Sequence, residues 1–239
     1  MKKEIFIDNN YVGTQTLLNM RLAKNYNYFI SNQITKTFKK YCGDKVKSKV
    51  IDFGAGIGQF SNVLSEFNVD LMAIEIDKNL RKNLVSKNIK TIEMSSIERN
   101  SVDYIFSINV LEHIKDDSRA IKDLHAKLKY KGIILIYVPA MEILWTNMDH
   151  EVEHYRRYDK KDISTKLNQA GFEIKLNEYA DSAGFFSILL FKLLRKKISF
   201  PSPRLLIMFD RFIFPIGRKL DFFLKNTLGK NLLIIAQKK

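Results

Sequence analysis

Three glycines at alternate positions, directly after an apolar run, constrain this chain more than any other feature. The run is residues 50–53, and the glycines are Gly54, Gly56 and Gly58. Glycine lets the backbone approach a ligand where a Cβ would collide, and the helical pattern that follows offers free N–H groups. A second apolar run ends at Glu75, about 20 residues further on, where a carboxylate can accept hydrogen bonds from two ribose hydroxyls. The glycine loop and the acid at Glu75 together predict a nucleotide site on an α/β sheet, although the glycines alone also fit an ordinary tight turn.

The spacing of the glycines decides between classes of nucleotide. The dinucleotide fingerprint is G-x-G-x-x-G, but here Gly58 comes one residue early and Gln59 stands where that fingerprint needs glycine. The G-x-G-x-G spacing after Asp52 resembles class I S-adenosylmethionine-dependent methyltransferases. Three further matches follow in the family's order within residues 25–180: NVLEHIKD at 109–116, YKGIILIYVP at 130–139 and AGFEI at 170–174.

Strand and helix patterns alternate from residue 50 to residue 138, which predicts a parallel sheet in an α/β fold. Helices are expected directly after Gly58, Asp77, Asp116 and Asp159. The resemblance implies a seven-stranded, mostly parallel, doubly wound, Rossmann-like sheet whose last strand, at residues 232–236, closes an antiparallel pair. It also implies a single methyltransferase domain over residues 1–239, with an N-terminal helical cover at 14–41.

A basic, Phe-rich helical insertion is predicted at residues 185–230, between the last two strands. From residue 185 to the end the chain has 12 Lys or Arg against two Asp or Glu, so +10 of the net +14 lies there, with nine of the 17 Phe. Such a charge calls for an anionic partner or surface, and neither apolar run of the insertion reaches the roughly 18 residues that a spanning helix needs. We expect it to contact an anionic membrane surface and to cover the acceptor site. Packing on the sheet as extra core, or a homodimer interface, is the alternative.

The single cysteine and the start of the chain bear on the cell compartment. Cys42 alone rules out an internal disulfide or a Cys-rich zinc site, and no apolar run of the kind a signal peptide needs follows the first four residues. We therefore expect a cytoplasmic protein that meets the membrane peripherally, at its inner face.

S-adenosylmethionine is the cofactor that the resemblance implies. Different residues are expected to bind its amino acid end and its adenosine end. The amino acid end and the loop beneath it are assigned to Asp52, Gly54, Ala55 and Gly56. Glu75 is expected to bridge the two ribose hydroxyls, and Ile76 to pack on the adenine.

Three further cofactor contacts rest on the same resemblance. Many relatives hold the adenine amino group with an acid, but this chain has Ser95 and Ser96 there, so a serine or the backbone must make that contact. Asn109 and Val110 are expected under the methionine portion. Tyr26 resembles a covering residue of some relatives, and a core aromatic is the equal alternative.

Methyl transfer depends mainly on aligning acceptor, carbon and sulfur, but an oxygen or nitrogen acceptor can also need a base, for which histidine is suited. The expected catalytic residues are His113, Asp149, His150 and His154. The pair Glu112-His113 is similar to one that binds a divalent metal or orients the acceptor in quinone O-methyltransferases. Those enzymes have an acid where Asn109 stands here, so no metal is predicted. A helix cap is the alternative for the pair.

Residues 144–158 carry a more specific pattern. They resemble the W...D....HYRRY signature of a bacterial subgroup of class I methyltransferases, whose members often sit beside or are fused to membrane glycosyltransferases. The matching residues are Trp145, Asp149, His154, Arg156, Arg157 and Tyr158. We expect this loop to face the transferred methyl, with Trp145, Arg156, Arg157 and Tyr158 binding the acceptor, because paired arginines suit a phosphate or carboxylate. An internal ion network that orders the loop is the alternative for the arginines.

The function expected from these residues is methyl transfer from S-adenosylmethionine to a small-molecule acceptor, amphipathic or linked to a lipid or glycan. The net charge of +14 keeps an RNA methyltransferase as an alternative. Against it, the Asn/Asp-Pro-Pro-aromatic motif of base-modifying enzymes is replaced by NVLE at 109–112, and Cys42 precedes the sheet, so we do not expect a nucleic-acid partner. A non-catalytic binding module is a third possibility, which the intact glycines and Glu75 disfavour.

Overall fold

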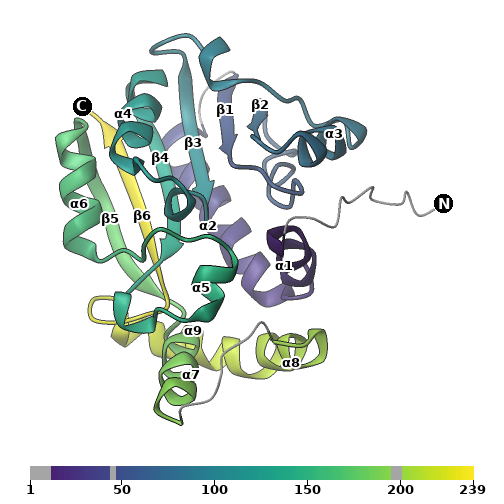
Figure 1. The fold of residues 1–239 in the computed structure, drawn as a ribbon. Coiled ribbons are helices and arrows are strands. Elements are labelled where there is room, and N and C mark those ends of the chain that lie inside the picture. Colours follow the sequence, from purple (N-terminus) through teal and green to yellow (C-terminus); the bar gives the residue numbers. More distant parts are fainter. Residues whose placement is uncertain (1–11, 44–46, 195–200) are drawn as a thin grey trace.

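The computed structural model describes residues 12–43, 47–194 and 201–239, and shows one central sheet with helices on both faces (Figure 1). The strands are β1 (Ser48–Phe53), β2 (Val69–Ile74), β3 (Val102–Ile108), β4 (Leu128–Pro139), β5 (Phe172–Ala180) and β6 (Asn231–Lys238). Their order across the sheet is β2-β1-β3-β4-β6-β5. The strands β1 to β4 pair in parallel, and β6 runs antiparallel between β4 and β5. The fold is therefore the mixed α/β sheet that the sequence predicted.

The central strand β4 shows why the sheet is covered on both sides. Its side chains alternate between two core clusters, with Ile134 and Ile136 in one and Leu135 and Tyr137 in the other. All four are buried, as expected of a parallel strand with helices over both faces. Helix α2 (Lys24–Cys42) packs into one cluster, while α4 (Asp117–Lys127) and α6 (Lys160–Gln169) pack into the other.

Aspartates start three of the helices where the sequence placed them. Asp77 caps α3 (Lys78–Ser86), and Asp116 and Asp159 cap α4 and α6, each accepting hydrogen bonds from backbone N–H groups of the first turn. The helix predicted after Gly58 is absent: residues 59–67 form successive turns. The bonds there, such as Val63 N–H to the Phe60 carbonyl, span three residues rather than four.

The sheet of the described residues has six strands, not the seven predicted. The missing edge strand is reduced to a single bridge between Ala73 and Thr91. The Ala73 N–H bonds to the Lys90 carbonyl and the Ile92 N–H to the Ala73 carbonyl, at 2.8 and 3.0 Å. The chain then turns into the short helix η1 (Met94–Ser96), so no further ladder bonds form.

Two helices stand where the N-terminal cover was expected, α1 (Val12–Met20) and α2. The buried side of α2 carries Tyr26, Phe29, Ile30, Ile34 and Phe38, at helical spacing. Its start is capped from far along the chain: the Asp210 carboxylate accepts hydrogen bonds from the Asn25 and Tyr26 N–H groups, both at 2.9 Å. The cover is thereby tied to the segment that follows β5.

That segment, between β5 and β6, is helical in its described parts. It contains α7 (Ser182–Leu193), α8 (Pro203–Met208), the π-helical turn η4 (Phe209–Ile213) and α9 (Phe214–Leu224). Residues 195–200, which include three of its basic residues, lie outside the described residues. Asn231 pairs with both Ala180 and Pro139, so the segment leaves and rejoins the sheet at the carboxyl edge of the parallel strands. In Figure 1 these helices lie together below that edge.

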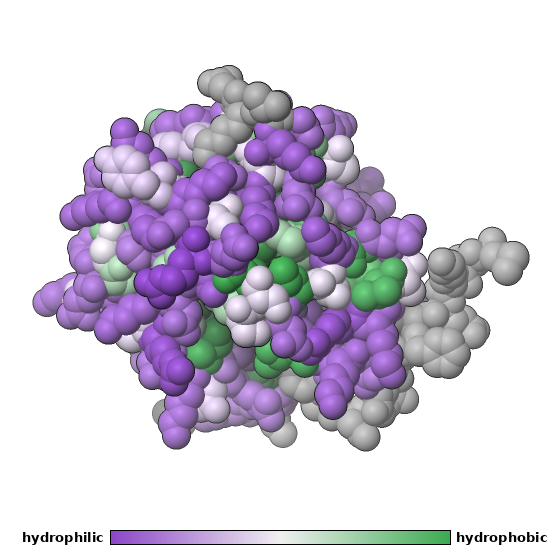
Figure 2. All heavy atoms as spheres, turned by 90° about the horizontal axis from the view of Figure 1, so that it is seen from above, coloured by the Kyte–Doolittle hydropathy of each residue, from purple (hydrophilic) through white to green (hydrophobic). Residues whose placement is uncertain are grey.

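The helices α7 to α9 have their acids inside and many of their apolar side chains outside. Asp210 and Asp221 are buried, whereas Phe222 and Phe223 are 73% and 77% exposed. Twelve further large apolar side chains between residues 186 and 223 are also exposed. They are Phe186, Leu190, Phe191, Leu193, Leu194, Leu205, Ile207, Met208, Phe212, Ile213, Ile216 and Leu220. Phe185 and Phe214 are buried and anchor the helices. Seen from above, at 90° to the view of Figure 1, the surface is mostly hydrophilic, with apolar groups near its middle (Figure 2).

Candidate active site

The glycine loop after β1 uses the backbone freedom of glycine. Gly54, Gly56 and Gly58 have φ angles of 78°, 55° and 76°, in the left-handed region that side chains disfavour. A Cβ at Gly54 would overlap the side chain of Val110. The loop predicted to hold the amino acid end thus packs directly on one of the residues predicted to lie under the methionine portion. Ala55, between the glycines, is buried.

Glu75 ties this loop to the end of β2. Its two carboxylate oxygens accept hydrogen bonds from the Gly56 N–H, at 2.7 Å, and the Asp77 N–H, at 2.9 Å. Next to it, Ile76 is 89% exposed. A large apolar side chain held in solvent beside a partly buried carboxylate is the pair of groups that an adenosine needs, one for its base and one for its ribose.

Asp52 lies deeper than the rest of the loop. It is buried, and one carboxylate oxygen accepts a hydrogen bond from the Ser61 hydroxyl at 2.7 Å. Burial raises the pKa of Asp52 to about 7, against the effect of that hydrogen bond. Its contact with Ser61 makes Asp52 a support beneath the glycine loop.

The turn after β3 brings Asn109 and Val110 to the same edge of the sheet. Asn109 has a φ of 53° and its N–H donates to the Tyr137 carbonyl at 2.7 Å, so its exposed side chain is held by a fixed backbone. Tyr26 is buried against Tyr137 and Phe214, with ring centroids 6.1 and 5.6 Å away. These contacts match the core-aromatic alternative for Tyr26.

Ser95 and Ser96 are exposed in η1, next to the edge of the sheet that carries β2. A cavity of about 450 Å³ opens instead on the Gly58 side of the loop, where Arg21, Lys24 and Lys87 are among its lining residues. Leu17 of α1 lies over Gly56, at ordinary van der Waals distance from the position of a Cβ there. In this conformation α1 therefore covers part of the loop.

The loop from Met141 to Arg157 is closed at its base by a bridge between Ala140 and Tyr158. Asp149, in the short helix α5 (Asn147–Glu151), lies at its centre. The Arg157 guanidinium donates to both Asp149 oxygens, at 2.8 and 3.0 Å, and His154 Nδ1 lies 2.9 Å from Oδ1. Burial alone would raise the pKa of Asp149, but the hydrogen bonds from His154 and Arg157 outweigh it and lower the pKa to about 2.

The other members of the signature are also engaged inside the protein. The Arg156 guanidinium pairs with Asp117 Oδ2 at 2.7 Å, and the buried Tyr158 hydroxyl donates to the same oxygen at 2.7 Å. Trp145 donates from Nε1 to His150 Nε2 at 2.9 Å. These contacts favour the internal ion network over direct acceptor binding for Arg156, Arg157 and Tyr158. Asp117, the partner of Arg156 and Tyr158, could not be inferred from the sequence pattern, because it is 41 residues from Tyr158.

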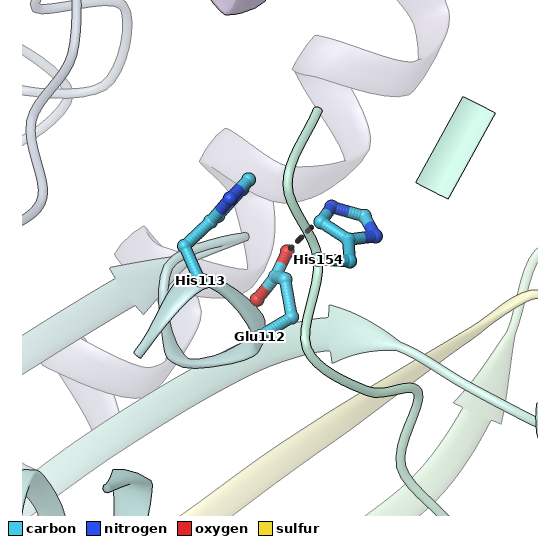
Figure 3. Close-up of side chains that lie close together, drawn as sticks. All are labelled: Glu112, His113 and His154. Atoms are coloured by element: carbon cyan, nitrogen blue, oxygen red, sulfur yellow. Dashed lines mark ion pairs between the residues drawn. The ribbon is translucent and has the colours of Figure 1, made fainter. Parts of the chain in front are cut away.

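Glu112 and His113, in the turn η2 (Leu111–His113) after β3, converge with His154 of the loop (Figure 3). The His154 Nε2 lies 3.9 Å from Glu112 Oε1, and the two imidazole centroids are 4.7 Å apart. Burial raises the pKa of Glu112 to about 8. Burial and then the neighbouring His154 lower the pKa of His113 to about 4. Two of the four predicted catalytic residues thus meet at one point, and Asp149 supports one of them; His150 is exposed and outside the cluster.

Comparison with known proteins assigns the family. The family model described as a methyltransferase domain matches residues 22–176, and the chain belongs to this family. An uncharacterized protein of Methanocaldococcus jannaschii is 28% identical over 209 residues, which cover 86% of this chain and 84% of that protein.

Solved structures show the same fold at lower identity. A SAM-dependent methyltransferase from Archaeoglobus fulgidus has a TM-score of 0.58 at 17% identity, covering 89% of this chain and 94% of that one. Phosphoethanolamine N-methyltransferase 2 of Haemonchus contortus, in complex with S-adenosyl-L-methionine, has a TM-score of 0.58 at 19% identity. The match covers 87% of this chain but 52% of that enzyme, so it spans about half of its length. Family membership, with the glycine loop and Glu75 arranged as above, supports S-adenosylmethionine as the cofactor, as the sequence predicted.

Proposed function

We propose that this protein transfers a methyl group from S-adenosylmethionine to an amphipathic acceptor presented at an anionic membrane surface. The observation that carries the proposal is the exposed apolar side of α7 to α9 at the carboxyl edge of the sheet, the edge that also holds the glycine loop and the loop 141–157. The resemblance of residues 144–158 to the signature of a bacterial subgroup supports an acceptor linked to a lipid or glycan.

Charge and exposure favour a lipid surface as the partner of these helices. Within the described part of residues 182–224, both acids are buried, while Lys192, Arg204, Arg211 and Lys219 are exposed. Each basic residue near an anionic bilayer contributes about 1 kcal/mol, and apolar side chains that enter the boundary with the acyl chains add to that. No helix among the described residues is long and apolar enough to cross a bilayer. The proposed contact is therefore monotopic.

Contacts between α7 and the loop 141–157 support a membrane surface close to the site. Lys192 Nζ donates to the carbonyls of Ile143 and Trp145, at 2.5 and 3.1 Å. An acceptor whose apolar part stays in the bilayer and whose polar group reaches the carboxyl edge would pass this junction. The proposal assigns Trp145 to the acceptor path and His154 to the polar end of the acceptor.

Vesicle sedimentation tests the membrane part. The full chain should sediment with vesicles containing phosphatidylglycerol, and salt should weaken this binding. The double variant Phe222→Ser, Phe223→Ser should bind at least about tenfold more weakly, because it removes two apolar side chains from the proposed contact. Tyr130→Ser is the matched control, since Tyr130 is 71% exposed at the opposite end of the sheet.

The same measurement separates the alternatives. A full chain that stays in solution with both anionic and neutral vesicles, and whose mass doubles in solution, would replace the membrane contact by a homodimer interface. Salt-sensitive binding to RNA, with no binding to vesicles, would favour the RNA methyltransferase.

Replacement of Glu75 tests the cofactor part. Calorimetry with S-adenosylmethionine should show at least about tenfold lower affinity for Glu75→Ala, because hydrogen bonds to a charged group contribute about 1.5–3 kcal/mol each. Glu66→Ala, which removes an exposed acid elsewhere, is the control. Unchanged affinity in Glu75→Ala would remove the ribose assignment.

A further inference from the structure

Glu112 is the one acid among Asp52, Glu112, Asp117 and Asp149 whose carboxylate has no hydrogen-bond donor. Its side chain is 0% exposed, and both oxygens lack a hydrogen-bond partner. A buried carboxylate without a donor is costly, and such an exception calls for a cause. The imidazole of His154 lies close to it, with Nε2 at 3.9 Å from Oε1.

The backbone holds this arrangement from both sides. The Tyr155 N–H donates to the Glu112 carbonyl at 2.8 Å, and the His154 N–H donates to the Asp149 carbonyl at 2.9 Å. His154 Nδ1 is engaged by the Asp149 carboxylate, which leaves Nε2 directed at Glu112 (Figure 3). A carboxylate on the far nitrogen of an imidazole is the usual support of a metal-binding histidine, because it fixes the tautomer and the ring orientation.

Although the sequence predicted no metal at the pair Glu112-His113, because Asn109 stands in place of an acid, we propose that Glu112, His113 and His154 bind a divalent cation of the zinc type. One ligand atom from each of the three residues lies within 4.8 Å of the others. Ligand atoms around a zinc ion, at about 2.0–2.2 Å from it, are roughly 3–3.5 Å apart, so small rotations of these side chains would complete the site. Two imidazoles and one carboxylate suit zinc and its first-row neighbours, whereas magnesium and calcium prefer oxygen ligands alone.

The cation would join two segments of the candidate active site. Glu112 and His113 follow β3, two residues after Val110, while His154 belongs to the loop after β4. Three protein ligands leave a fourth position for water or for an oxygen of the acceptor. This role for the open position rests on the proposed function; the binding of the cation itself does not.

Metal binding to the full chain, stripped with a chelator, tests the proposal. Equilibrium dialysis should give one Zn²⁺ per chain, and Co²⁺ should produce the visible absorption of a site with nitrogen and oxygen ligands. Glu112→Gln and His113→Gln should each weaken Zn²⁺ binding at least about tenfold. His150→Gln is the matched control: it removes an imidazole of the same loop that lies outside the cluster, so binding should be unchanged.

Two readouts keep the outcomes separate. Circular dichroism and the affinity for S-adenosylmethionine show whether each variant is folded and whether the cofactor site is intact. Stoichiometric Zn²⁺ binding that Glu112→Gln and His113→Gln each weaken at least about tenfold, with the cofactor affinity kept, supports the site. A chain that binds S-adenosylmethionine but no Zn²⁺, or whose Zn²⁺ affinity is unchanged by both substitutions, overturns the metal site and leaves the proposed function standing.

Discussion

The loop 141–157 and the helices α7 to α9 leave the same edge of the sheet, but they are built in opposite ways. In the loop, the acid Asp149 is paired with the Arg157 guanidinium and contacts the His154 imidazole, and Leu144 is buried. In the helices, Asp221 accepts from the backbone N–H groups of Asp181 and Ser182, at 3.1 and 2.7 Å, and from Arg218. Their apolar side chains point outward instead.

The difference shows how each region keeps its shape. The loop is ordered by side-chain ion pairs, so its functional side chains are held by one another. The helices are ordered by acids that cap backbone groups and by a few buried anchors, among them Phe185 and Phe214. Because those contacts are internal, we expect the outer apolar side chains to contribute little to folding and to be available for contact with a partner. The ion pairs of the loop position individual side chains, whereas the helices present an apolar surface.

The largest effect should come from Asp149→Ala, which removes the centre of the loop. Arg157, with a side chain 7% exposed, would keep its charge without an acidic partner, and breaking a buried pair in this way costs about 3–5 kcal/mol. Urea unfolding measures the loss. Asp123→Ala is the control, because its pair with Arg119 is exposed and should contribute less than about 1 kcal/mol. If both variants lose the same stability, the ion network does not order the loop.

Much of the fold could be predicted because its signals are local. The glycine loop, the caps Asp77, Asp116 and Asp159, and the alternation along β4 each lie within a few residues of the structure they specify. The predictions of the fold failed where the local sequence signal was weak. The edge strand was expected from family resemblance, but the chain turns into η1 after the bridge at Thr91.

The candidate site was less predictable, because its partners are distant in sequence. Glu112 and His154 were both noted, but their convergence depends on the bridge that closes the loop and on the bond from Tyr155 to Glu112. Likewise, the sequence pattern RRY does not show that Arg156 and Tyr158 share Asp117. The Phe-rich segment could be recognised from its composition. Which of its phenylalanines are exposed could not, because that depends on how Asp210 and Asp221 bind backbone N–H groups elsewhere in the chain.

The acid stability of the loop is the next largest effect. The pKa of Asp149 in the folded protein, about 2, is below its ordinary value of 3.8. The ionised form is therefore favoured by folding: the stabilisation is present above about pH 4 and is lost as pH falls towards about 2. A shift of this size corresponds to about 2 kcal/mol. The stability difference between the wild type and Asp149→Asn should shrink by that amount between pH 5 and pH 2, measured by urea unfolding. A difference that stays constant over this range would contradict the pKa.

A smaller effect is expected where the helices meet the cover. Asp210→Ala removes the cap of α2, which should cost about 1 kcal/mol, the usual value for such a cap. Hydrogen exchange should locate the loss at the Asn25 and Tyr26 amides, whose acceptor is removed. Asp116→Ala is the control, because it removes a local cap from α4 and should leave those two amides protected. Equal protection at Asn25 and Tyr26 in the wild type and in Asp210→Ala would show that the two regions are not tied through this residue.

The smallest effect on stability should come from the outer side of the helices. Phe222 and Phe223 are 73% and 77% exposed, and they contact each other edge to face with ring centroids 5.2 Å apart. Replacing both by Ser removes little buried area, so the free energy of unfolding should change by no more than about 0.5 kcal/mol. Phe214→Ser, in the same helix but buried, should cost several kcal/mol, as cavity-forming substitutions do. Near-equal losses in the two variants would mean that the outer phenylalanines are covered in solution, by a second copy of the chain, and the contrast between an inward-held loop and an outward-facing surface would then fail. A loss confined to Phe214→Ser, together with weaker vesicle binding of the double variant, would separate the residues that fold the helices from those that meet the membrane.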